Sequence, residues 1–491
     1  MNILDKAIAV FAPGTGLKRA NARAVLDQYQ ERDYAAARHG RRNRGWRSRS
    51  TSANVEIAGA LTALRDRARE FVRDSWQGQR ILDVLVSHAV GTGITVVPNT
   101  GSDRADNRFR MLWQDWLGGA DAEGVMDFGA MQALAVRSMI EGGESVLRFI
   151  DPGIDQAGGL VPLWLQGLEG DQIDSTKDRG LAGDNFRLGV ELGDYHRRQA
   201  LWLHPEHPGD MTLAGARNST RVPWADLCHL YRPLRWGQIR GVSWFSAILL
   251  TGKEDQDLIE AAIVQARTQA SFAGFLKRQP GGTNVLAAKK EEDGEKVTKI
   301  APGTIADIGD SDIVFANPSS QSSFQEIHVA AMQGMAAGAW LTYDQLTGDL
   351  TRANYSSLRA GKIEFRRLVE QLQWGILAPR MVMPTVRRFT GRALLAGMLP
   401  QRRGGYPVDL IMPANEPIDP KKDMEADIMA VRSGRMTPQE FMSAWGVDWR
   451  KNIGDVAAFF AVTDKAGVAL DIDPRRPAQG GTQRVEMEQQ P

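Results

Sequence analysis

The spacing of apolar residues changes along this sequence of 491 residues, and these changes limit the possible folds more than any other feature. From Val55 to about Ile140, apolar residues recur every three or four positions, which predicts amphipathic helices. One such stripe consists of Ile57, Leu61, Leu64, Ala68 and Phe71. From about residue 144 to 232 the period becomes two, which predicts strands at 145–150, 161–168, 186–192 and 199–204. The two patterns together predict an α+β fold.

A long helix follows the predicted strands. It is expected over 243–272, with Gly252 as its lone internal glycine, and at 1.5 Å per residue it would reach about 45 Å. Residues 274–324 break into short strands and turns, and helix returns over about 325–340. Two long helices therefore flank a short, irregular segment.

The C-terminal third is predicted to be mainly helical. A polar, glycine-containing break at 347–357 precedes a long helix over about 358–377. Thr437 and Glu440 have the spacing of a capping box, with a proline at the first helical position, and predict the start of a short helix. About the last twenty residues are expected to be disordered.

The charge of the chain is nearly balanced, with 60 basic and 59 acidic residues and a formal net charge of +1. A dedicated nucleic-acid binder usually has a clear basic excess, so any DNA contact must be local or indirect. Six arginines and no acid lie between Tyr34 and Ala53, among them Arg41, Arg42 and Arg44. This basic arm is either a solvated, flexible tail or an electrostatic contact with nucleic acid or with an acidic neighbouring subunit.

Known catalytic motifs are absent from the sequence. It contains no phosphate-binding loop, no G-x-S-x-G elbow and no H-E-x-x-H helix, so we expect neither an NTPase nor another enzyme. The lone cysteine excludes a disulfide framework and fits a reducing compartment. We also expect no cofactor and no membrane association, because no apolar run approaches the ~20 residues that a spanning helix needs.

Two weak metal patterns remain. His204, His207, Cys228 and His229 could in principle hold zinc, but their local sequences favour a turn and a buried strand. Acidic pairs could hold Mg²⁺ in a nuclease, although turns and solvated faces explain them better. These pairs are Asp255 with Asp257, Asp310 with Asp312, and Asp471 with Asp473. No metal site is therefore predicted.

Short motifs in a fixed order, from about residue 50 to 460, resemble the phage portal proteins of the lambda family. They include Val90-Gly-Thr-Gly-Ile94, Trp113-Gln-Asp-Trp116, Arg221-Val-Pro223 and Gln238-Ile-Arg-Gly-Val242. The most specific is Leu346-Thr-Gly-Asp-Leu-Thr-Arg-Ala-Asn-Tyr-Ser-Ser-Leu-Arg359. The first 50 residues and the tail depart from the family pattern.

This resemblance implies a structural function. The family forms a ring, normally of twelve subunits, at one vertex of the procapsid, and double-stranded DNA passes through it during packaging and ejection without sequence-specific contact. Its implied partners are the large subunit of terminase, which supplies ATP hydrolysis, the major capsid and scaffold proteins, and head-completion or tail-connector proteins. The implied location is the capsid vertex of the virion, after assembly in the host cytoplasm.

The family architecture is a portal-type subunit with an α/β wing, long stem helices, a small α/β clip, a tunnel loop with a long helix, and a helical crown. Mapped onto this sequence, the parts follow in chain order. They are the basic N-terminal arm 1–55, the wing 56–242, the first stem helix 243–273, the clip 274–324, the second stem helix 325–346, the tunnel loop 347–356, the long helix with the connection to the crown 357–399, the helical crown 400–470, and a disordered tail 471–491.

Three groups of residues are candidates for function in such a ring. Glu254, Asp257 and Glu260 would form an acidic stripe on the channel wall, unless they form an ordinary solvated helix face. In the tunnel loop, Arg352 and Asn354 would contact phosphates intermittently, unless Asp349 and Asn354 only stabilise a turn. Mixed charge in the clip suits a surface for terminase or for subunit pairing, with Lys289, Lys290, Lys296 and Lys299 as its basic residues.

Two alternatives from other classes stay open at this point. One is a metal-dependent nuclease that uses the acidic pairs. The other is a monomeric DNA-binding module of a mobile element that uses the arginine arm. The mass of the assembled protein separates both from a ring.

Overall fold

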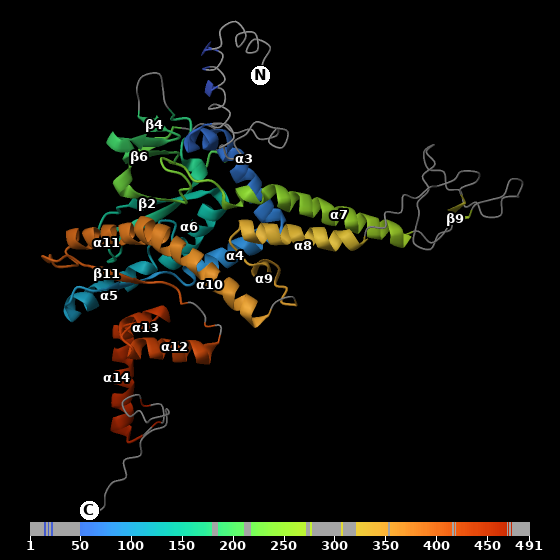
Figure 1. Cartoon of the computed structure of the whole chain (residues 1–491). Coiled ribbons are helices and arrows are strands. Elements are labelled where there is room, and N and C mark those ends of the chain that lie inside the picture. The colour runs from blue at the N-terminus through green and yellow to red at the C-terminus, as the bar shows by residue number, and fades with distance from the viewer. Residues whose placement is uncertain are drawn as a thin grey trace, which may run out of the picture. The chain divides into compact units, whose positions relative to one another are not determined.

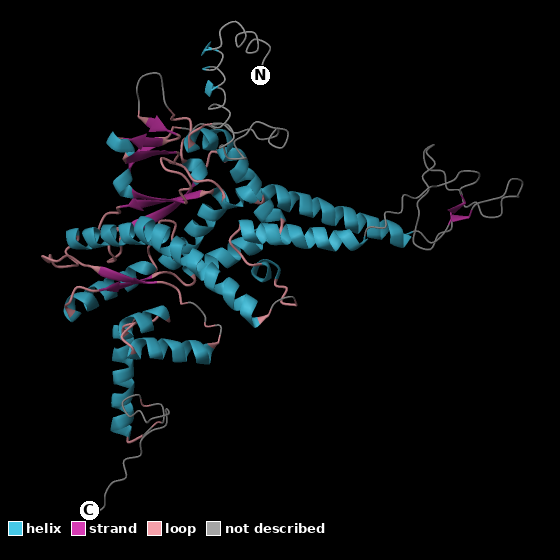
Figure 2. Cartoon of the chain, viewed as in Figure 1, coloured by secondary structure: helices cyan, strands magenta, loops and turns pink. Residues whose placement is uncertain are grey.

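The computed structural model divides the chain into two units, Met1–Ser52 and Ala53–Pro491. All elements discussed below lie in the second unit, which mixes helices with small sheets (Figures 1 and 2). Apart from isolated positions, the residues that the structure describes are 50–178, 185–210, 218–271, 275–276, 306–307, 321–351, 354–414 and 419–468.

Four helices begin the second unit: α3 (Ala53–Asp74), α4 (Trp76–Val90), α5 (Asp103–Leu117) and α6 (Phe128–Gly142). Side chains cap two of them, because the Ser75 hydroxyl accepts from the Gly78 amide and the Asp127 carboxylate accepts from the Ala130 amide. Ala53, Ile57 and Leu61 of α3 belong to a second cluster, and the other apolar faces of these helices meet in one main core. Its aromatic centre consists of Phe109, Trp113, Trp116, Phe128 and Phe389, in edge-to-face, tilted and stacked contacts.

Two antiparallel sheets follow. In the first, β2 (Glu144–Ile150) lies between β3 (Trp164–Glu169) and β8 (Leu227–Tyr231). The second has the order β4-β5-β6-β7 and carries a separate core cluster. Its strands are β4 (Phe186–Arg187), β5 (Val190–Leu192), β6 (Arg198–Leu203) and β7 (Thr220–Pro223).

One predicted strand, over 186–192, is in fact a tight hairpin. Leu188 and Gly189 have positive φ angles of 47° and 83°, so the chain reverses between β4 and β5. A Cβ atom at Gly189 would lie 2.6 Å from the Cγ2 atom of Ile173, so glycine meets both the conformation and the close packing. The alternating pattern hides this turn because apolar residues continue the period of two through it, at Phe186, Leu188, Val190 and Leu192.

Two further strand pairs complete the sheets. β1 (Thr95–Pro98) pairs antiparallel with β11 (Val408–Ile411), which connects the first helices to a segment more than 300 residues later. β9 (Phe275–Leu276) pairs parallel with β10 (Ala306–Asp307). The segment between β9 and β10, with Lys289, Lys290, Lys296, Lys299, Asp310 and Asp312 in or beside it, lies outside the described residues.

The predicted helix over 243–272 consists of a short 3₁₀ turn (Trp244–Ala247) followed by α7 (Leu249–Ser271). Helix α8 (Gln321–Gly338) packs beside α7 (Figure 1). It ends two residues earlier than predicted because Trp340 has a left-handed φ of 69°. The short α9 (Tyr343–Thr347) follows.

The long helix predicted over 358–377 continues much further. It comprises α10 (Tyr355–Leu372), a π-helical segment (Gln373–Val382) and α11 (Met383–Leu395). Proline at position 379 would normally break an α-helix by clashing with the carbonyl four residues earlier, and the wider π turn moves that carbonyl away. The Gln373 amide donates to the carbonyls of His88 and Ala89, which are orphan acceptors at the end of α4.

Three helices form the C-terminal part: α12 (Pro420–Arg432), α13 (Pro438–Ala444) and α14 (Trp449–Ala466). The predicted capping box at α13 is confirmed, because the Thr437 amide donates to Glu440 and the Glu440 amide donates to the Thr437 hydroxyl. Among the described residues, no helix combines the length and the apolar composition that crossing a membrane requires.

Candidate functional site

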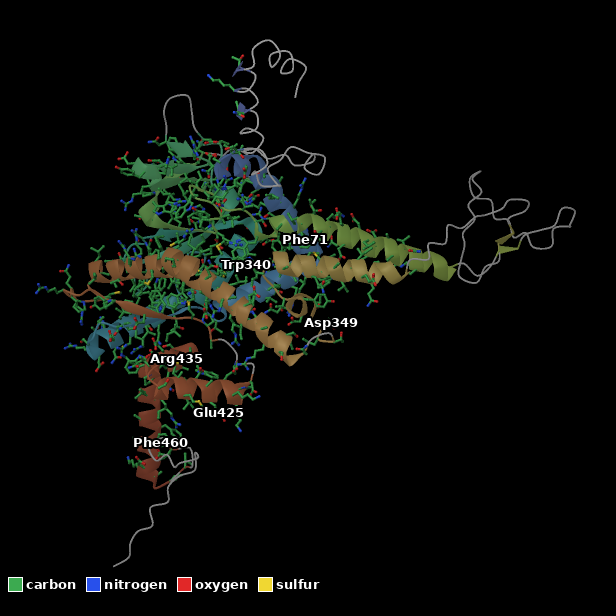
Figure 3. The ribbon with its side chains drawn as sticks, viewed as in Figure 1. Phe71, Trp340, Asp349, Glu425, Arg435 and Phe460 are labelled. Carbon is green, nitrogen blue, oxygen red and sulfur yellow. The ribbon has the colours of Figure 1, made fainter. Side chains whose placement is uncertain are left out.

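Helices α7 and α8 form an antiparallel pair joined by a hydrogen bond between Asp255 and His328. Asp255 of α7 is buried, and its Oδ1 atom lies 2.7 Å from Nδ1 of His328 on α8. Nearer the core, Gly252 leaves room for Phe71 of α3, since a Cβ atom there would lie 2.5 Å from the Phe71 ring (Figure 3). Gly252, the one internal glycine of the predicted helix, therefore allows α7 to pack closely against α3.

The three acids predicted on the channel wall are all exposed. Glu254, Asp257 and Glu260 lie on the side of α7 away from buried Asp255, and positions three apart are rotated by 60° relative to one another. Lys253 donates to Asp257 at 2.8 Å, and this hydrogen bond raises the pKa of Lys253. The stripe thus includes one locally paired acid.

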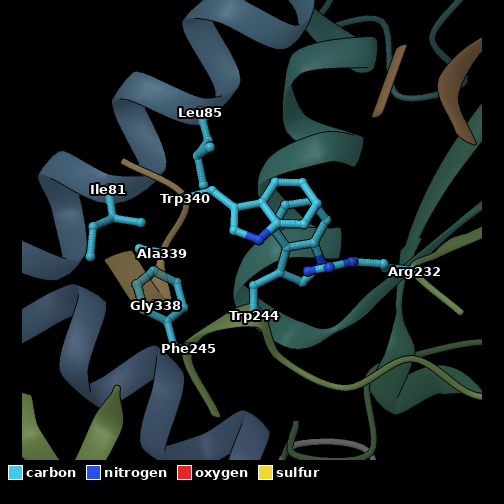
Figure 4. Close-up of a pocket in the computed structure, with 8 residues that line it drawn as sticks. All are labelled: Ile81, Leu85, Arg232, Trp244, Phe245, Gly338, Ala339 and Trp340. Atoms are coloured by element: carbon cyan, nitrogen blue, oxygen red, sulfur yellow. The ribbon is translucent and has the colours of Figure 1, made fainter. Parts of the chain in front are cut away.

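An aromatic clamp closes the base of this helix pair (Figure 4). The guanidinium of Arg232 lies over Trp340, 3.9 Å from its ring centroid, and 5.2 Å from that of Trp244. The two tryptophan rings are 5.0 Å apart at 56°. Trp244 begins the segment that leads into α7, and Trp340 follows the end of α8. The clamp thus joins both helices to Arg232, just beyond β8, and half-burial of Arg232 lowers its pKa.

Trp340 occupies a position that normally belongs to glycine. The Trp340 amide donates to the carbonyl of Ala337, and the Leu341 amide donates to that of Ala336, which is the hydrogen-bond pattern of a Schellman motif. In this motif a non-glycine residue at positive φ costs about 1–2 kcal/mol. No sequence pattern predicted the clamp, although a tryptophan directly after a helical run is itself unusual.

The loop between α9 and α10 is built from local side-chain hydrogen bonds. Asp349 accepts from the amide and hydroxyl of Thr351, at 2.9 and 2.6 Å. Asn354 caps α10, because its Oδ1 atom accepts from the Ser357 amide at 2.8 Å while the Ser357 hydroxyl accepts from the Asn354 amide. The turn considered as the alternative for this loop is therefore present, and Arg352 lies outside the described residues.

An open cleft of about 740 Å³ borders this loop. One wall is the end of α3 and the start of α4, with Trp76 exposed, and the other wall is 346–348. Its charged residues alternate in sign: Arg73, Asp74, Arg80 and Asp83. The Arg80 guanidinium donates to the Gln345 carbonyl at 2.9 Å, which ties α4 to α9.

A buried ionic network holds the β2 sheet against α3. Glu144 at the start of β2 is fully buried and accepts from Arg240, Arg65 and His229 at 2.6, 2.8 and 2.9 Å. Burial alone would raise the pKa of Glu144, but Arg240 and the hydrogen bond from His229 outweigh it and hold that pKa far below its usual range. Burial lowers the pKa of His229, against the opposing effect of Glu144.

The residues considered for zinc do not come together. His204 lies 3.7 Å from Asp174, and His207 lies 3.7 Å from both Glu169 and Asp171. Cys228 and His229 are neighbours on β8 and point to opposite faces. Burial raises the pKa of the Cys228 thiol to about 12, which leaves it a protonated, poor metal ligand.

A different group of possible ligands does meet among the described residues, namely Glu169, Asp171 and His207. Both carboxylates, however, already pair with the guanidinium of Arg69. A cationic side chain thus holds the position that a metal ion would take, and the cluster is an ion-pair network on the surface of the β2 sheet.

Where the structure describes the acidic residues considered for a nuclease, they have other interactions. Asp255 is buried against His328, whereas Asp257 is exposed beside Lys253, so the two carboxylates face different ways. Asp471 lies outside the described residues. So do Arg41, Arg42 and Arg44 of the arm, and their function stays a prediction.

Comparison with known proteins gives the chain its family. The sequence profile of the family described as "Phage portal protein, lambda family" matches residues 39–373. The chain is 25% identical over 426 residues to the probable portal protein of Halomonas phage phiHAP-1, covering 80% of each protein. It is 22% identical over 312 residues to portal protein B of Escherichia phage lambda, covering 54% of this chain and 56% of that protein.

A solved structure is also similar. It is a chain of the neck of a native gene transfer agent particle, computed with C12 symmetry, at 15% identity and a TM-score of 0.41. The match covers 80% of this chain and 93% of that one. Because the family profile matches well over half of its residues, the chain belongs to the lambda family of phage portal proteins and is a structural protein of a virus particle, not an enzyme.

Proposed function

We propose that this chain assembles into a ring, of twelve subunits by the family expectation, at one vertex of a capsid. Double-stranded DNA would pass through the ring during packaging and ejection. The observation that carries this proposal is the family match over 39–373, which spans the residues that we assign to the wing, to both stem helices and to the loop signature. The paired helices α7 and α8, which lead to and from the segment 272–320, are consistent with the stem of such a subunit.

The parts of the proposed subunit correspond to observed elements. The wing would comprise α3 to α6 with the two sheets, and the stem would be α7 with α8. The tunnel loop would lie between α9 and α10, and the crown would be α12 to α14. The segment 274–324 would form the clip, where Lys289, Lys290, Lys296 and Lys299 would contact the large subunit of terminase.

DNA must slide through a portal, and this requirement sets the charge of the channel wall. Each lysine or arginine that neutralises a phosphate releases counterions and adds affinity, which would resist movement. Exposed acids do the opposite, so Glu254, Asp257 and Glu260 suit a wall that surrounds DNA without binding it. A ring would repeat this stripe in every subunit.

The tunnel loop would provide the few contacts that DNA does make. In this proposal Arg352 contacts phosphates intermittently, and Asn354 sets the loop by capping α10 rather than by touching DNA. Because the capping hydrogen bond uses the side-chain oxygen of Asn354, its main contribution is to the conformation of the loop.

The remaining partners follow from the same proposal. The ring would be incorporated with the major capsid and scaffold proteins in the host cytoplasm, and head-completion or tail-connector proteins would bind it after packaging. A monomeric DNA-binding module that uses the arginine arm is the competing hypothesis, and it predicts a different mass in solution.

Mass photometry of the purified full-length chain tests the ring. Twelve copies of a 54.0 kDa chain would give a particle of about 650 kDa, visible as a ring by negative-stain microscopy. The assay should be run over a range of salt and protein concentrations, with and without the scaffold protein. A chain that stays monomeric under all of these conditions would overturn the proposal.

A further inference from the structure

The loop between β8 and the 3₁₀ turn before α7 carries two exposed apolar side chains. Leu234 is 60% exposed and Trp236 is 104% exposed, more than in an extended reference peptide. We call residues 233–237 the aromatic finger. Burying a large apolar side chain is worth about 1.5–3 kcal/mol, so a fully solvated tryptophan is a conspicuous loss for an isolated subunit.

The backbone of the finger is held rigidly from below by Gln238, which is 4% exposed. Its Oε1 atom accepts from the amides of Leu234 and Arg235, at 2.7 and 3.3 Å. Its Nε2 atom donates to the carbonyls of Arg240 and Arg232, at 2.8 and 3.5 Å. One buried amide therefore fixes four points of the loop around the tryptophan.

A second buried side chain pins the other end. Asn54 at the start of α3 donates to the Gly237 carbonyl at 2.9 Å and accepts from the Ile239 amide at 3.1 Å. The Gln238 carbonyl in turn accepts from Arg198 and Tyr231. Because the backbone of the finger is already fixed, Trp236 would lose little conformational entropy on binding. Exposed aromatic residues of this kind often anchor protein interfaces.

The cleft beside α4 offers a receptor for such an anchor. The cleft is open to solvent, its volume of about 740 Å³ exceeds that of an indole ring, and half-exposed Trp76 gives it apolar surface. The finger lies at the start of α3, beside Asn54, and the cleft lies at the end of α3, beside Arg73 and Asp74. A helix of 22 residues separates them, which at 1.5 Å per residue is about 33 Å.

Because the finger and the cleft are this far apart, the Trp236 side chain of one chain cannot reach the cleft of the same chain, so the partner must be another molecule. A ring is built from head-to-tail contacts, in which each subunit presents an anchor on one side and a receptor on another. Here both are present on one chain, at opposite ends of a single helix. Charge is balanced on both sides: Arg235 beside the finger forms a 3.1 Å exposed ion pair with Glu56, and in the cleft Asp74 pairs with Arg73 and Asp83 with Arg137. Exposed ion pairs are weak, so Arg235 can exchange its partner at little cost.

We propose that Trp236 of one subunit inserts into the cleft between the start of α4 and residues 346–348 of the next copy of this chain. The inference rests on the proposed ring. Burying a tryptophan removes about 150–250 Å² of surface, against about 800 Å² per partner in a standard interface, so the finger is the anchor of a larger contact. Residues 346–348 lead into the tunnel loop, so each anchor would brace the loop of its neighbour.

Alanine substitution tests the anchor. Trp236→Ala should raise the concentration at which half of the chains are in rings by at least about 30-fold, the loss typical of a hot-spot residue. Tyr195→Ala is the matched control, because Tyr195 is also fully exposed on a turn, between β5 and β6, and should leave assembly unchanged. Trp236→Phe should assemble at intermediate concentrations. Thermal unfolding below the assembly concentration should be the same for all three variants.

Disulfide cross-linking tests the receptor. The only cysteine, Cys228, is buried, so Trp236→Cys with Thr347→Cys introduces the only accessible thiols. Oxidised rings of this variant should give a ladder of covalent multimers on a non-reducing gel. Tyr195→Cys with Thr347→Cys should give none.

The outcomes separate this inference from the function it rests on. Wild-type chains that never form rings overturn both. Wild-type rings that Trp236→Ala forms equally well, or an equal ladder from the control pair, overturn the anchor and leave the ring intact. If Trp236→Ala rings assemble normally but fail to enter capsids, the occupant of the finger is another capsid protein, and the proposed contact between copies is wrong.

Discussion

The guanidinium of Arg232 lies 3.9 Å from the ring centroid of Trp340, and the backbone of Trp340 has a φ of 69°. Trp340 thus adopts a left-handed backbone conformation that glycine adopts without strain, and its ring stacks on the half-buried guanidinium of Arg232. Cation–π contacts of this kind are worth up to about 2 kcal/mol when partly desolvated. The side-chain contact thus offsets the backbone strain at the base of α7 and α8.

Two substitutions at Trp340 separate the strain from the contact. Trp340→Ala loses the clamp and keeps the strain, whereas Trp340→Gly loses the clamp and relieves the strain. We expect both to be less stable than wild type, and Trp340→Ala to be less stable than Trp340→Gly by about 1 kcal/mol. Urea unfolding followed by circular dichroism measures the difference. Equal stabilities would mean that the left-handed backbone is unstrained.

The buried carboxylate of Glu144 should contribute strongly to the stability of the β2 sheet and α3. Glu144→Gln leaves Arg240 buried without its counter-charge and removes one of the two carboxylates that pair with Arg65, so it should lower the free energy of unfolding by about 3–5 kcal/mol. Glu206→Gln, at an exposed glutamate, serves as the control and should have no effect. A loss below 1 kcal/mol would show that water or neighbouring groups compensate the two arginines.

The same carboxylate predicts a pH dependence. An ordinary glutamate has a pKa of about 4.3, and the folded chain holds the pKa of Glu144 below this value. As the pH falls, Glu144 is therefore protonated in the unfolded chain before it is protonated in the folded chain. The stabilisation is therefore complete between about pH 5 and 7 and declines below about pH 4. The gap between wild type and Glu144→Gln should narrow in that acid range, as measured by unfolding at each pH.

Asp255 and Asp257 provide a matched pair on α7. Asp255→Asn weakens a partly buried hydrogen bond to His328 and should cost about 2 kcal/mol, with faster hydrogen exchange in α7 and α8. Asp257→Asn changes an exposed residue and should be close to neutral. If instead both substitutions abolished a Mg²⁺-dependent cleavage of DNA, the nuclease hypothesis would return.

Charge reversal tests the channel wall. Changing Glu254, Asp257 and Glu260 to lysine should leave ring assembly intact and slow DNA packaging, because twelve added stripes of positive charge would bind the phosphates. The slowing should weaken as the salt concentration rises. Packaging at the wild-type rate in low salt would mean that these side chains do not face DNA.

Two substitutions in the loop between α9 and α10, the proposed tunnel loop, distinguish the roles of Arg352 and Asn354. Asn354→Ala removes the cap of α10 and should cost about 1 kcal/mol of stability. Arg352→Ala should leave stability unchanged and impair packaging or retention of DNA. Unimpaired packaging by Arg352→Ala would remove this residue from the proposed contacts with DNA.

Local sequence determined much of the chain. Helical periodicity after Val55, the strand at 145–150 and the capping box at Thr437 were predictable because helix stripes, strand alternation and caps depend on residues a few positions apart. The ordered motifs, above all the signature over 346–359, pointed to the family. In the structure this signature encodes local geometry, with Leu346 buried, Asp349 in a turn and Asn354 as a cap.

The tertiary structure alone decided the rest, because those features depend on residues distant in the sequence. Glu144 meets Arg240, 96 residues away, and Asp255 meets His328, 73 residues away, so no local pattern distinguishes them from exposed acids such as Asp257. The stop at Trp340 depends on Arg232, and the hairpin at Gly189 depends on Ile173 packed against it. How much each of these residues contributes to stability depends on its burial, and burial is decided only when distant parts of the chain pack together.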